Sequence, residues 1–419
     1  MRRARSERKL PEKEAEGVVE TLGHRGEGVL KVRGQTIYVP GTVPGDHVRV
    51  VHAGERGRLL ALIAEGPARV TPPCPHFGAC GGCTLQHVSV ESYRRFKMEG
   101  IESALRARGI ACAVAPLASV PLRSRRRATF AFSRRGREVA LGFHGLQSHD
   151  VANIVECLVL VPALAAALRP LRNWLVHCLA GDGAGTMHVT LCDNGLDIDL
   201  ALTRGRLSAQ GPFMVPEGIV LARVTVAGEI AAQYAPPQIS LDGIAMGPPP
   251  RAFLQPTRDG EAQLQAWVGE GVGTPRRVAD LFCGLGTFAL PLAKTATVHA
   301  VEMEASLLDA LQAASRRTTG LKPVVAECRD LMRAPVPAKH LEDFDAVVFD
   351  PPRAGAAAQT SEIASSGVRR VVAVSCNPAT FARDARILLD SGYELAWLRP
   401  LDQFLFTAHI ELVGLFVRQ

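Results

Sequence analysis

The sequence predicts an α/β fold, in which a doubly wound parallel sheet follows a small β-barrel and a central α+β region. Beyond residue 251, strand-length apolar runs (VADLF, TVHAVE, DAVVFD, VVAVSC) alternate with helical patterns. Such alternation is typical of parallel strands joined by crossover helices. Residues 14–66 instead contain five short β-rich segments separated by glycine turns, which is the pattern of an OB-like barrel.

The domain boundaries follow from these patterns. A chain of 419 residues is too long for one hydrophobic core. We place the barrel at 10–68, a central domain at 69–250 and the doubly wound domain at 251–419. Within the central domain, the segment VESYRRFKMEGIESALRARG (90–109) and residues 162–180 are predicted helices, and runs such as RRRATFAF and MHVTLC are predicted strands.

The composition excludes a membrane protein and a secreted one. The longest apolar run, LVLVPALAAAL (158–168), falls short of the roughly 18 residues that suggest a membrane span. The first residues, MRRARSERKLPEKEAEG, have no apolar core and are not a secretory signal. We therefore expect a cytoplasmic protein without membrane contact, and by default a monomer.

Arginines are concentrated in the first third of the chain. They form three runs, MRRARSERK (1–9), RSRRR (123–127) and SRRGR (133–137), within a formal charge of +7. A single run of this kind is as often a solvated surface as a binding site. Three runs favour a polyanionic partner, with Arg125 and Arg126 expected to contact its phosphates.

Residues 278–293 are predicted to form a strand, a tight glycine turn and a helix, from the sequence VADLFCGLGTFALPLA. Gly284 and Gly286 would let a ligand approach the backbone at the carboxyl end of the strand. Glu302, at the end of the next strand, could accept hydrogen bonds from both ribose hydroxyls of an adenosyl group. The spacing Gly284-x-Gly286-x-x-Ala289 also fits a dinucleotide fingerprint, so the loop fits both NAD and S-adenosylmethionine.

Two later strand ends favour the second ligand. DAVVFDPPRAG places Asp350 and Arg353 where methyltransferases that act on bases present their target. VVAVSCNPATF places Cys376 before Asn377 and Pro378, which begin a helix. The helix amino terminus is expected to lower the pKa of the Cys376 thiol and so favour a nucleophilic thiolate.

The stretch CPHFGACGGC contains Cys74, Cys80 and Cys83. In a reducing compartment such a cluster is more often a metal site or a catalytic site than a set of disulfides. Four thiolates would suit either tetrahedral zinc or a cubane iron–sulfur cluster.

Five motifs together resemble the RNA uracil-C5 methyltransferases of the RumA/TrmA type, in particular their iron–sulfur-containing ribosomal RNA branch. The motifs are CPHFGACGGC, DLFCGLGTF, FDPPRAG, SCNPATF and DQFLFTAHIEL. The resemblance covers nearly the whole chain. It implies an amino-terminal TRAM barrel, a central domain that carries an iron–sulfur cluster, and a class I methyltransferase domain.

The resemblance also implies roles for particular residues. It makes Cys74, Cys80, Cys83 and Cys157 the ligands of a 4Fe-4S cluster. It implies an S-adenosylmethionine site lined by Gln255, Phe282, Gly284, Gly286, Thr287, Glu302, Asp330 and Asp350. Thr287 stands where family members often have Asn, and Leu405 stands where they usually have Pro.

The implied reaction is methylation of carbon-5 of a uridine. Cys376 would add to carbon-6 of the uracil, and a base would then remove the carbon-5 proton. His409 and Glu411 are two residues apart and would share a face of a strand. The resemblance favours Glu411 as the base.

The iron–sulfur branch points to large-subunit (23S) ribosomal RNA as the substrate. The same chemistry on a transfer RNA T-loop uridine is the alternative. Two alternative hypotheses assign the chain to other functional classes. These are an NAD-dependent oxidoreductase and a non-catalytic RNA-binding or assembly factor.

Overall fold

The computed structural model describes residues 12–146 and 148–418. These residues divide into two compact units. The first contains residues 12–100 together with 145, 146, 148 and 406–408, and the second contains the other described residues. The division into three domains at 68 and 250 stays a prediction. Among the described residues, no helix has the length and apolar character needed to cross a membrane.

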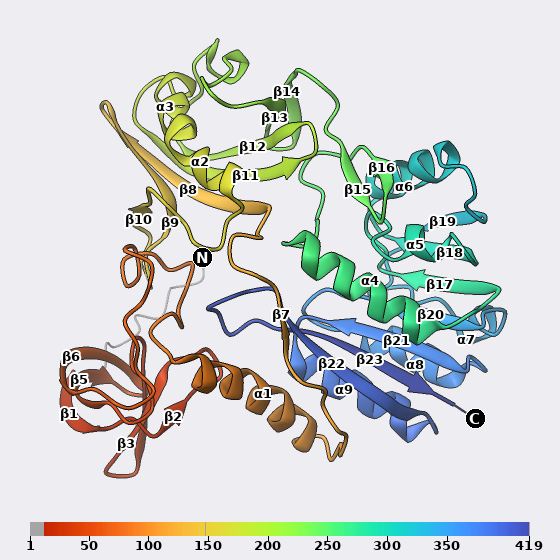
Figure 1. The fold of residues 1–419 in the computed structure, drawn as a ribbon, viewed down its shortest axis with the longest axis horizontal. Helices are drawn as coiled ribbons and strands as arrows, with labels where there is room; N and C mark the ends of the chain where they lie inside the picture. The colour runs from red at the N-terminus through yellow and green to blue at the C-terminus, as the bar shows by residue number, and fades with distance from the viewer. Residues whose placement is uncertain (1–11, 147, 419) are drawn as a thin grey trace, which may run out of the picture. The chain divides into compact units, whose positions relative to one another are not determined.

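The first unit contains a six-stranded sheet with the order β1-β5-β6-β4-β3-β2 (Figure 1). Its buried side chains form a core of Val19, Leu30, Ile37, Val39, Val48 and Val50. The strands are β1 (Lys13–Val18), β2 (Thr21–Leu22), β3 (Gly28–Val32), β4 (Gln35–Val39), β5 (His47–Ala53) and β6 (Arg56–Ala64).

The prediction of five strands here was wrong by one. The predicted first strand, GVVETL, is interrupted between β1 and β2. The backbone N–H of Val19 donates to Asp46 O and that of Glu20 to Val29 O, both at 2.8 Å. As a result, β1 pairs with β5, whereas β2 pairs with β3.

The second unit contains a seven-stranded sheet with the order β10-β9-β8-β11-β12-β13-β14. Its strands are β8 (Arg127–Arg135), β9 (Glu138–His144), β10 (Val151–Asn153), β11 (Gly183–Cys192), β12 (Gly195–Arg204), β13 (Leu221–Val226) and β14 (Glu229–Gln233). The helix predicted over 162–180 is interrupted at Ala167. The structure has α2 (Pro162–Ala166) and α3 (Leu168–Cys178) there, and the 3-10 helix η1 (Gly211–Phe213) follows later. Helix α1 (Val90–Arg106) precedes this sheet in the chain.

The second unit also contains the predicted doubly wound sheet, with the order β19-β18-β17-β20-β21-β23-β22-β7. Strands β17 to β21 are parallel, and β23 is antiparallel between β21 and β22. Its strands are β7 (Ala118–Ser119), β17 (Arg277–Leu281), β18 (Thr297–Glu302), β19 (Val324–Cys328), β20 (Ala346–Phe349), β21 (Arg370–Ser375), β22 (Glu394–Asp402) and β23 (Glu411–Val417). A hairpin of β15 (Ile239–Leu241) and β16 (Ile244–Met246) precedes it.

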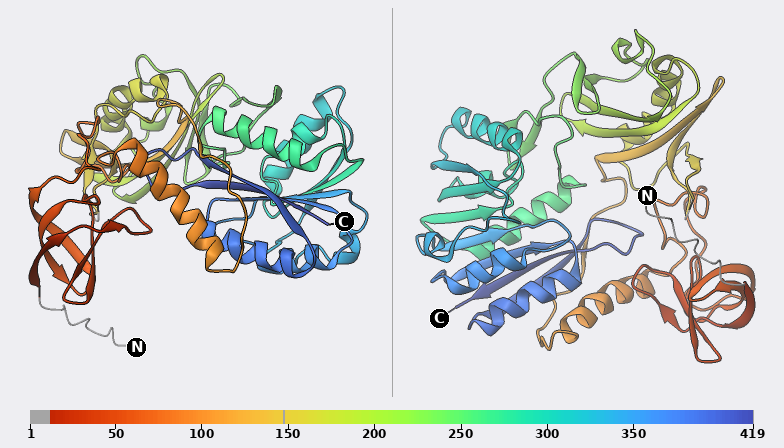
Figure 2. Two further views of the ribbon diagram at one scale, coloured as in Figure 1. Left: turned by 60° about the horizontal axis from the view of Figure 1, so that its bottom comes forward. Right: turned by 180° about the vertical axis from the view of Figure 1, so that it is seen from behind.

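Helices cover both faces of this sheet. Figure 2 shows the green helix α4 and the blue helix α9 on opposite faces. The helices are α4 (Arg258–Val272), α5 (Ala289–Leu292), α6 (Ala305–Arg317), α7 (Ala338–Leu341), α8 (Ala357–Ser365) and α9 (Pro378–Asp390). Thr257 caps α4, because its Oγ1 accepts a hydrogen bond from Gly260 N at 3.0 Å.

The strand order reverses between β17 and β20. Strands β18 and β19 extend the sheet on one side of β17, and β20 and β21 extend it on the other. In open α/β sheets the carboxyl ends of the strands at such a switch point form the binding crevice. Leu281 pairs with Phe349 at these two ends, so Phe282 and Asp350 are neighbours there.

The run RSRRR is only partly available as the expected phosphate-binding surface, since Arg123 is exposed and Arg125 is half-buried. Arg126 is only 2% exposed, and its Nη2 bonds Glu261 Oε2 at 2.6 Å. The guanidinium of Arg127 lies over the ring of Phe253, 4.3 Å from its centroid. Arg126 was therefore wrongly predicted to contact RNA, because the charge of a residue in a sequence run does not reveal its buried partner.

The run SRRGR also contains both an arginine bound within the protein and exposed arginines. The Nη1 of Arg134 donates to the carbonyl oxygens of Val176 and Leu179, each at 2.6 Å, at the carboxyl end of α3. Arg135 and Arg137 are exposed beside the turn between β8 and β9. The third run, MRRARSERK, lies outside the described residues.

Candidate active site

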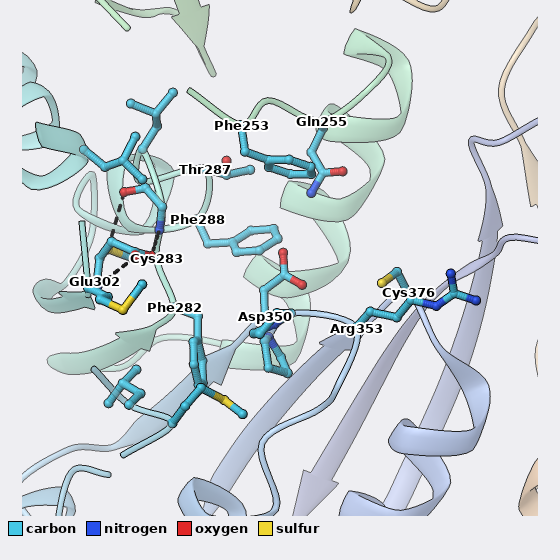
Figure 3. A pocket seen from close by; sticks show the side chains of 18 of the residues that line it. Phe253, Gln255, Phe282, Cys283, Thr287, Phe288, Glu302, Asp350, Arg353 and Cys376 are labelled. Atoms are coloured by element: carbon cyan, nitrogen blue, oxygen red, sulfur yellow. Dashed lines mark hydrogen bonds between the residues drawn. The ribbon is translucent and has the colours of Figure 1, made fainter. Parts of the chain in front are cut away.

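A cavity of about 500 Å³ lies at the switch point of the doubly wound sheet (Figure 3). Its size is within the range of small-molecule sites. Nine of the ten residues predicted for catalysis or cofactor binding line it. They are Gln255, Phe282, Gly284, Thr287, Glu302, Asp330, Asp350, Cys376 and Glu411.

The glycine turn after β17 holds the backbone close to this cavity. Phe282 has φ 61° and Gly284 has φ 54°, the left-handed region that is costly for Phe. A Cβ at Gly284 would meet nothing within 4 Å, so this backbone is open to a ligand. A Cβ at Gly286 would lie 2.4 Å from Leu311 Cδ1. Gly286 therefore allows close packing of α6 and does not line the cavity, unlike its predicted role.

Glu302 ends β18 with its carboxylate fixed by backbone donors. Its Oε2 accepts from Gly284 N at 3.1 Å, and its Oε1 accepts from Met303 N at 2.7 Å. The same Oε1 accepts from Glu304 N at 3.1 Å. The carboxylate thus joins the glycine turn to the start of α6, and it is held in one orientation in the cavity wall.

Asp350 follows β20, and its backbone N–H donates to Leu281 O at 3.2 Å. Burial raises the pKa of Asp350 to about 7. Asp280 is fully buried on β17; burial, and then the charge of Asp350, raise its pKa well above the ordinary value. A positive charge placed in this cavity would therefore be stabilised by acidic groups.

Cys376 follows β21, and Asn377 separates it from the first residue of α9. Asn377 caps that helix, because its Oδ1 accepts from Ala379 N at 3.1 Å. The pKa of the Cys376 thiol is nevertheless raised to about 11, first by burial and then by the charges of Glu411 and Asp350. The expected lowering of this pKa by the helix terminus was wrong, because burial and two carboxylates outweigh it.

Glu411 is the first residue of β23 and is 6% exposed. Burial, and then the charge of Asp350, raise the pKa of Glu411 well above its usual range, while a hydrogen bond from Gln403 opposes this shift. His409 lies before the strand and is exposed. The two residues therefore do not share a strand face, and only Glu411 lines the cavity.

The sequence reasoning did not find the apolar walls of the cavity. Phe253, Phe288, Met303, Leu331 and Met332 line it together with the predicted residues. Phe253 is 58% exposed, and its ring lies near Gln255 in Figure 3. Phe253 could have been predicted as a lining residue, because it lies two residues before Gln255 and follows the GPPPR segment. In the same view Glu302 and Cys376 lie at opposite sides of the site, with Asp350 between them.

The predicted metal ligands lie elsewhere. Cys80 and Cys83 line a smaller cavity in the first unit, together with Arg25, Phe77 and Thr84. The backbone N–H of Gly82 donates to Cys80 Sγ at 3.4 Å, and that of Cys74 to Gln86 Oε1 at 3.2 Å. Cys157 lies between β10 and α2 in the second unit. Within residues 12–146 and 148–418, no three His, Cys, Asp or Glu side chains are grouped so as to hold a metal ion, and no disulfide is formed.

The sheet order and the position of the cavity define a class I methyltransferase fold. A crystal structure of the Pyrococcus abyssi tRNA (uracil-54, C5)-methyltransferase with S-adenosyl-L-homocysteine has this fold, with a TM-score of 0.75. That alignment covers 96% of this chain and 100% of the other, at 24% sequence identity.

Sequence comparison gives the family. Residues 247–419 match the family described as tRNA (uracil-5-)-methyltransferase. An RNA methyltransferase of Rhizobium meliloti is 42% identical over 94% of this chain and 97% of its own length. The 23S rRNA (uracil(1939)-C(5))-methyltransferase RlmD of Edwardsiella ictaluri is 35% identical over 93% of each chain. The chain belongs to the RNA uracil-C5 methyltransferase family, as its motifs predicted.

Proposed function

We propose that this enzyme transfers a methyl group from S-adenosylmethionine to carbon-5 of a uridine in 23S ribosomal RNA, through a covalent cysteine–uracil adduct. One observation carries the proposal. The thiol of Cys376 and the carboxyls of Glu411 and Asp350 share a single cavity with the fixed carboxylate of Glu302. An NAD-dependent oxidoreductase would give Cys376 and Glu411 no role.

The residues of the cavity fit S-adenosylmethionine. The orientation of Glu302 suits a bidentate contact with the ribose hydroxyls. Asp330 and the apolar side chains of Leu331 and Met332 suit the adenine side. The open backbone at Gly284 suits the methionine part of the ligand. When bound, S-adenosylmethionine supplies an electrophilic methyl group, and the acidic groups around Asp350 favour its sulfonium charge.

The chain's own residues would then act in sequence. Sγ of Cys376 forms a bond to carbon-6 of the uracil, which makes carbon-5 nucleophilic. After carbon-5 has gained the methyl group, Glu411 accepts the carbon-5 proton. The bond between Sγ and carbon-6 breaks as the double bond re-forms, and this step releases the methylated RNA. Proton loss from the thiol must accompany substrate addition, because the pKa of Cys376 is raised to about 11.

The choice of ribosomal RNA rests on sequence similarity over nearly the whole chain. The RlmD relative is 35% identical over 93% of each chain, whereas the tRNA-modifying structure is 24% identical and supports only the shared fold.

We also propose that the first sheet is a TRAM barrel and that Cys74, Cys80, Cys83 and Cys157 bind a 4Fe-4S cluster. Four thiols are the donor set of such a cluster, and the N–H of Gly82 donates to the sulfur of Cys80. The described side chains do not form a group that would hold a metal. We therefore derive no step of the reaction from the cluster.

The test is methyl transfer to defined RNA. Purified enzyme is incubated with labelled S-adenosylmethionine and unmodified 23S rRNA or tRNA transcripts, and 5-methyluridine is mapped by mass spectrometry. We expect incorporation at one uridine of 23S rRNA and none with Cys376→Ala. Incorporation only into tRNA would contradict the choice of substrate. RNA binding without any incorporation would favour a non-catalytic factor.

A further inference from the structure

Gln403 lies close to the predicted base, within the motif DQFLFTAHIEL, and the sequence alone assigns it no role. It follows β22 directly and is only 2% exposed. Leu401 of β22 pairs with Glu411 across the two antiparallel strands. Gln403 lies two residues beyond Leu401, so its backbone leaves the strand pair close to Glu411.

The amide of Gln403 contacts one residue of the cavity and acts on a second. Its Nε2 donates to Gln255 Oε1 at 2.8 Å. A side-chain hydrogen bond from Gln403 also partly offsets the raised pKa of Glu411. A Gln amide carries two N–H donors, so one side chain can serve both acceptors. Gly260, in the first turn of α4, leaves room for this amide, since a Cβ there would lie 2.5 Å from Gln403 Oε1.

The acceptor atom of Gln403 distinguishes it from a structural glutamine. Among the described residues its buried Oε1 has no hydrogen-bond partner, an arrangement that normally costs stability. Gln359, which is equally buried on α8, uses both atoms. Its Oε1 accepts from Val336 N at 2.8 Å and its Nε2 donates to Val336 O at 3.2 Å. Gln403 leaves its acceptor unused while its donors serve two cavity residues.

We propose that Gln403 is a positioning residue that fixes the Glu411 carboxyl and the Gln255 amide of the active site together. Because Gln255 Oε1 accepts from Gln403, the Nε2 of Gln255 remains available as a donor toward the cavity. Because Gln403 donates to Glu411, it favours the carboxylate form that a base requires. The role of Gln403 toward Glu411 rests on the proposed function. Its role toward Gln255 concerns ligand binding alone.

The two contacts predict two separable defects in Gln403→Met, which keeps the side-chain volume and removes both donors. In single turnover, release of methylated RNA from the covalent adduct should slow about ten- to a hundredfold, as expected for a lost hydrogen bond to a charged group. The preceding methyl transfer, measured at saturating S-adenosylmethionine, should slow less than about threefold. Calorimetry should show S-adenosylhomocysteine binding about three- to tenfold more weakly, as expected for one neutral hydrogen bond. Gln403→Glu, which keeps the shape but adds a carboxylate beside Glu411, should not restore release.

Gln359→Met is the matched control. It should lower the unfolding midpoint in urea without changing the ratio of methyl transfer to release. A Gln403→Met enzyme with wild-type release and wild-type ligand affinity would overturn the proposal. A Gln403→Met enzyme in which every step and the stability fall together, as for a structural glutamine, would also overturn it. If wild-type enzyme forms no adduct and no 5-methyluridine, the proposed function fails, and calorimetry still decides whether Gln403 orients Gln255.

Discussion

The thiol of Cys376 is placed among groups that oppose its ionisation. Burial raises its pKa most, and the charges of Glu411 and Asp350 add to this effect. The charge of Arg353 acts in the opposite direction, but it is the weakest contribution. In the ligand-free enzyme the thiol is therefore protonated at neutral pH, and its nucleophilicity has to arise with substrate bound.

This state can be measured by alkylation of ligand-free enzyme. We expect the rate of Cys376 modification by iodoacetamide to be low at pH 7 and to rise through pH 10 toward the pKa of about 11. Glu411→Gln removes a negative charge that disfavours the thiolate, so its alkylation profile should shift to lower pH. Peptide mass spectrometry identifies the modified residue. An alkylation rate that reaches half of its maximum near pH 7 would show that the helix amino terminus does lower the pKa of this thiol.

Replacing the base should separate the two halves of the reaction. Glu411→Gln keeps the Cys376 nucleophile and the cofactor residues but leaves the carbon-5 proton without an acceptor. We expect a methylated RNA–protein adduct that survives denaturing electrophoresis, with turnover lowered at least about a hundredfold. The double variant with Cys376→Ala should form no adduct. Normal turnover by Glu411→Gln would assign the proton to another acceptor.

At the scale of elements, the start of β8 is held to the first turns of α4 by a buried ion pair. Arg126 bonds Glu261 Oε2 at 2.6 Å, and its Nε donates to Gln255 O at 3.1 Å. Arg126 and Glu261 are 2% and 4% exposed. Burial is the main cause of the raised pKa of Glu261, and Arg126 partly offsets it. Breaking such a pair leaves an uncompensated buried charge.

Arg126→Met should therefore destabilise the protein by about 3–5 kcal/mol. The pKa of Glu261 should rise further without its partner, so the native state holds this proton to higher pH than the unfolded chain. By linkage, the loss of stability is smallest at low pH and grows as pH rises through the raised folded pKa. Urea unfolding at pH 5 and pH 8 measures both effects. Adding Glu261→Gln should recover part of the loss; a change below about 1 kcal/mol would show that the pair is not buried in solution.

The sequence predicted elements better than contacts. The alternation of apolar runs and helices correctly predicted β17, β18, β20 and β21, because burial on both faces of a parallel sheet leaves a strong local pattern. Strand ends at a switch point necessarily converge, so residues such as Asp350 and Cys376 could be expected at one site. Local sequence could not reveal the inward turn of Arg126, the Gly286–Leu311 contact or the Gln403–Gln255 bond. Each depends on a partner that is distant in the chain.

At the scale of the whole molecule, RNA affinity should depend on the arginines that the fold leaves exposed. Arg135→Glu with Arg137→Glu should weaken binding of rRNA fragments of any sequence, and the slope of log K against log salt should fall by about one for each lost phosphate contact. Reversing the exposed pair Arg316 and Arg317 on α6 makes the same change in charge elsewhere. Equal effects of the two double variants would indicate a general charge effect rather than a binding surface.

The proposed cluster ligands determine which metal the purified protein should contain. If Cys74, Cys80, Cys83 and Cys157 bind a 4Fe-4S cluster, anaerobically purified protein should be brown and contain about four irons per chain. Cys157→Ser should lose the colour and most of the iron, because a cubane cluster needs four ligands. Cys112→Ser, which removes a half-buried cysteine outside the predicted set, should keep both. Metal binding contributes to folding, so the Cys157 variant should also unfold at lower urea concentration.

One zinc per chain and no iron would replace the cluster with a tetrahedral zinc site. Loss of iron in Cys112→Ser but not in Cys157→Ser would show that the predicted fourth ligand is wrong.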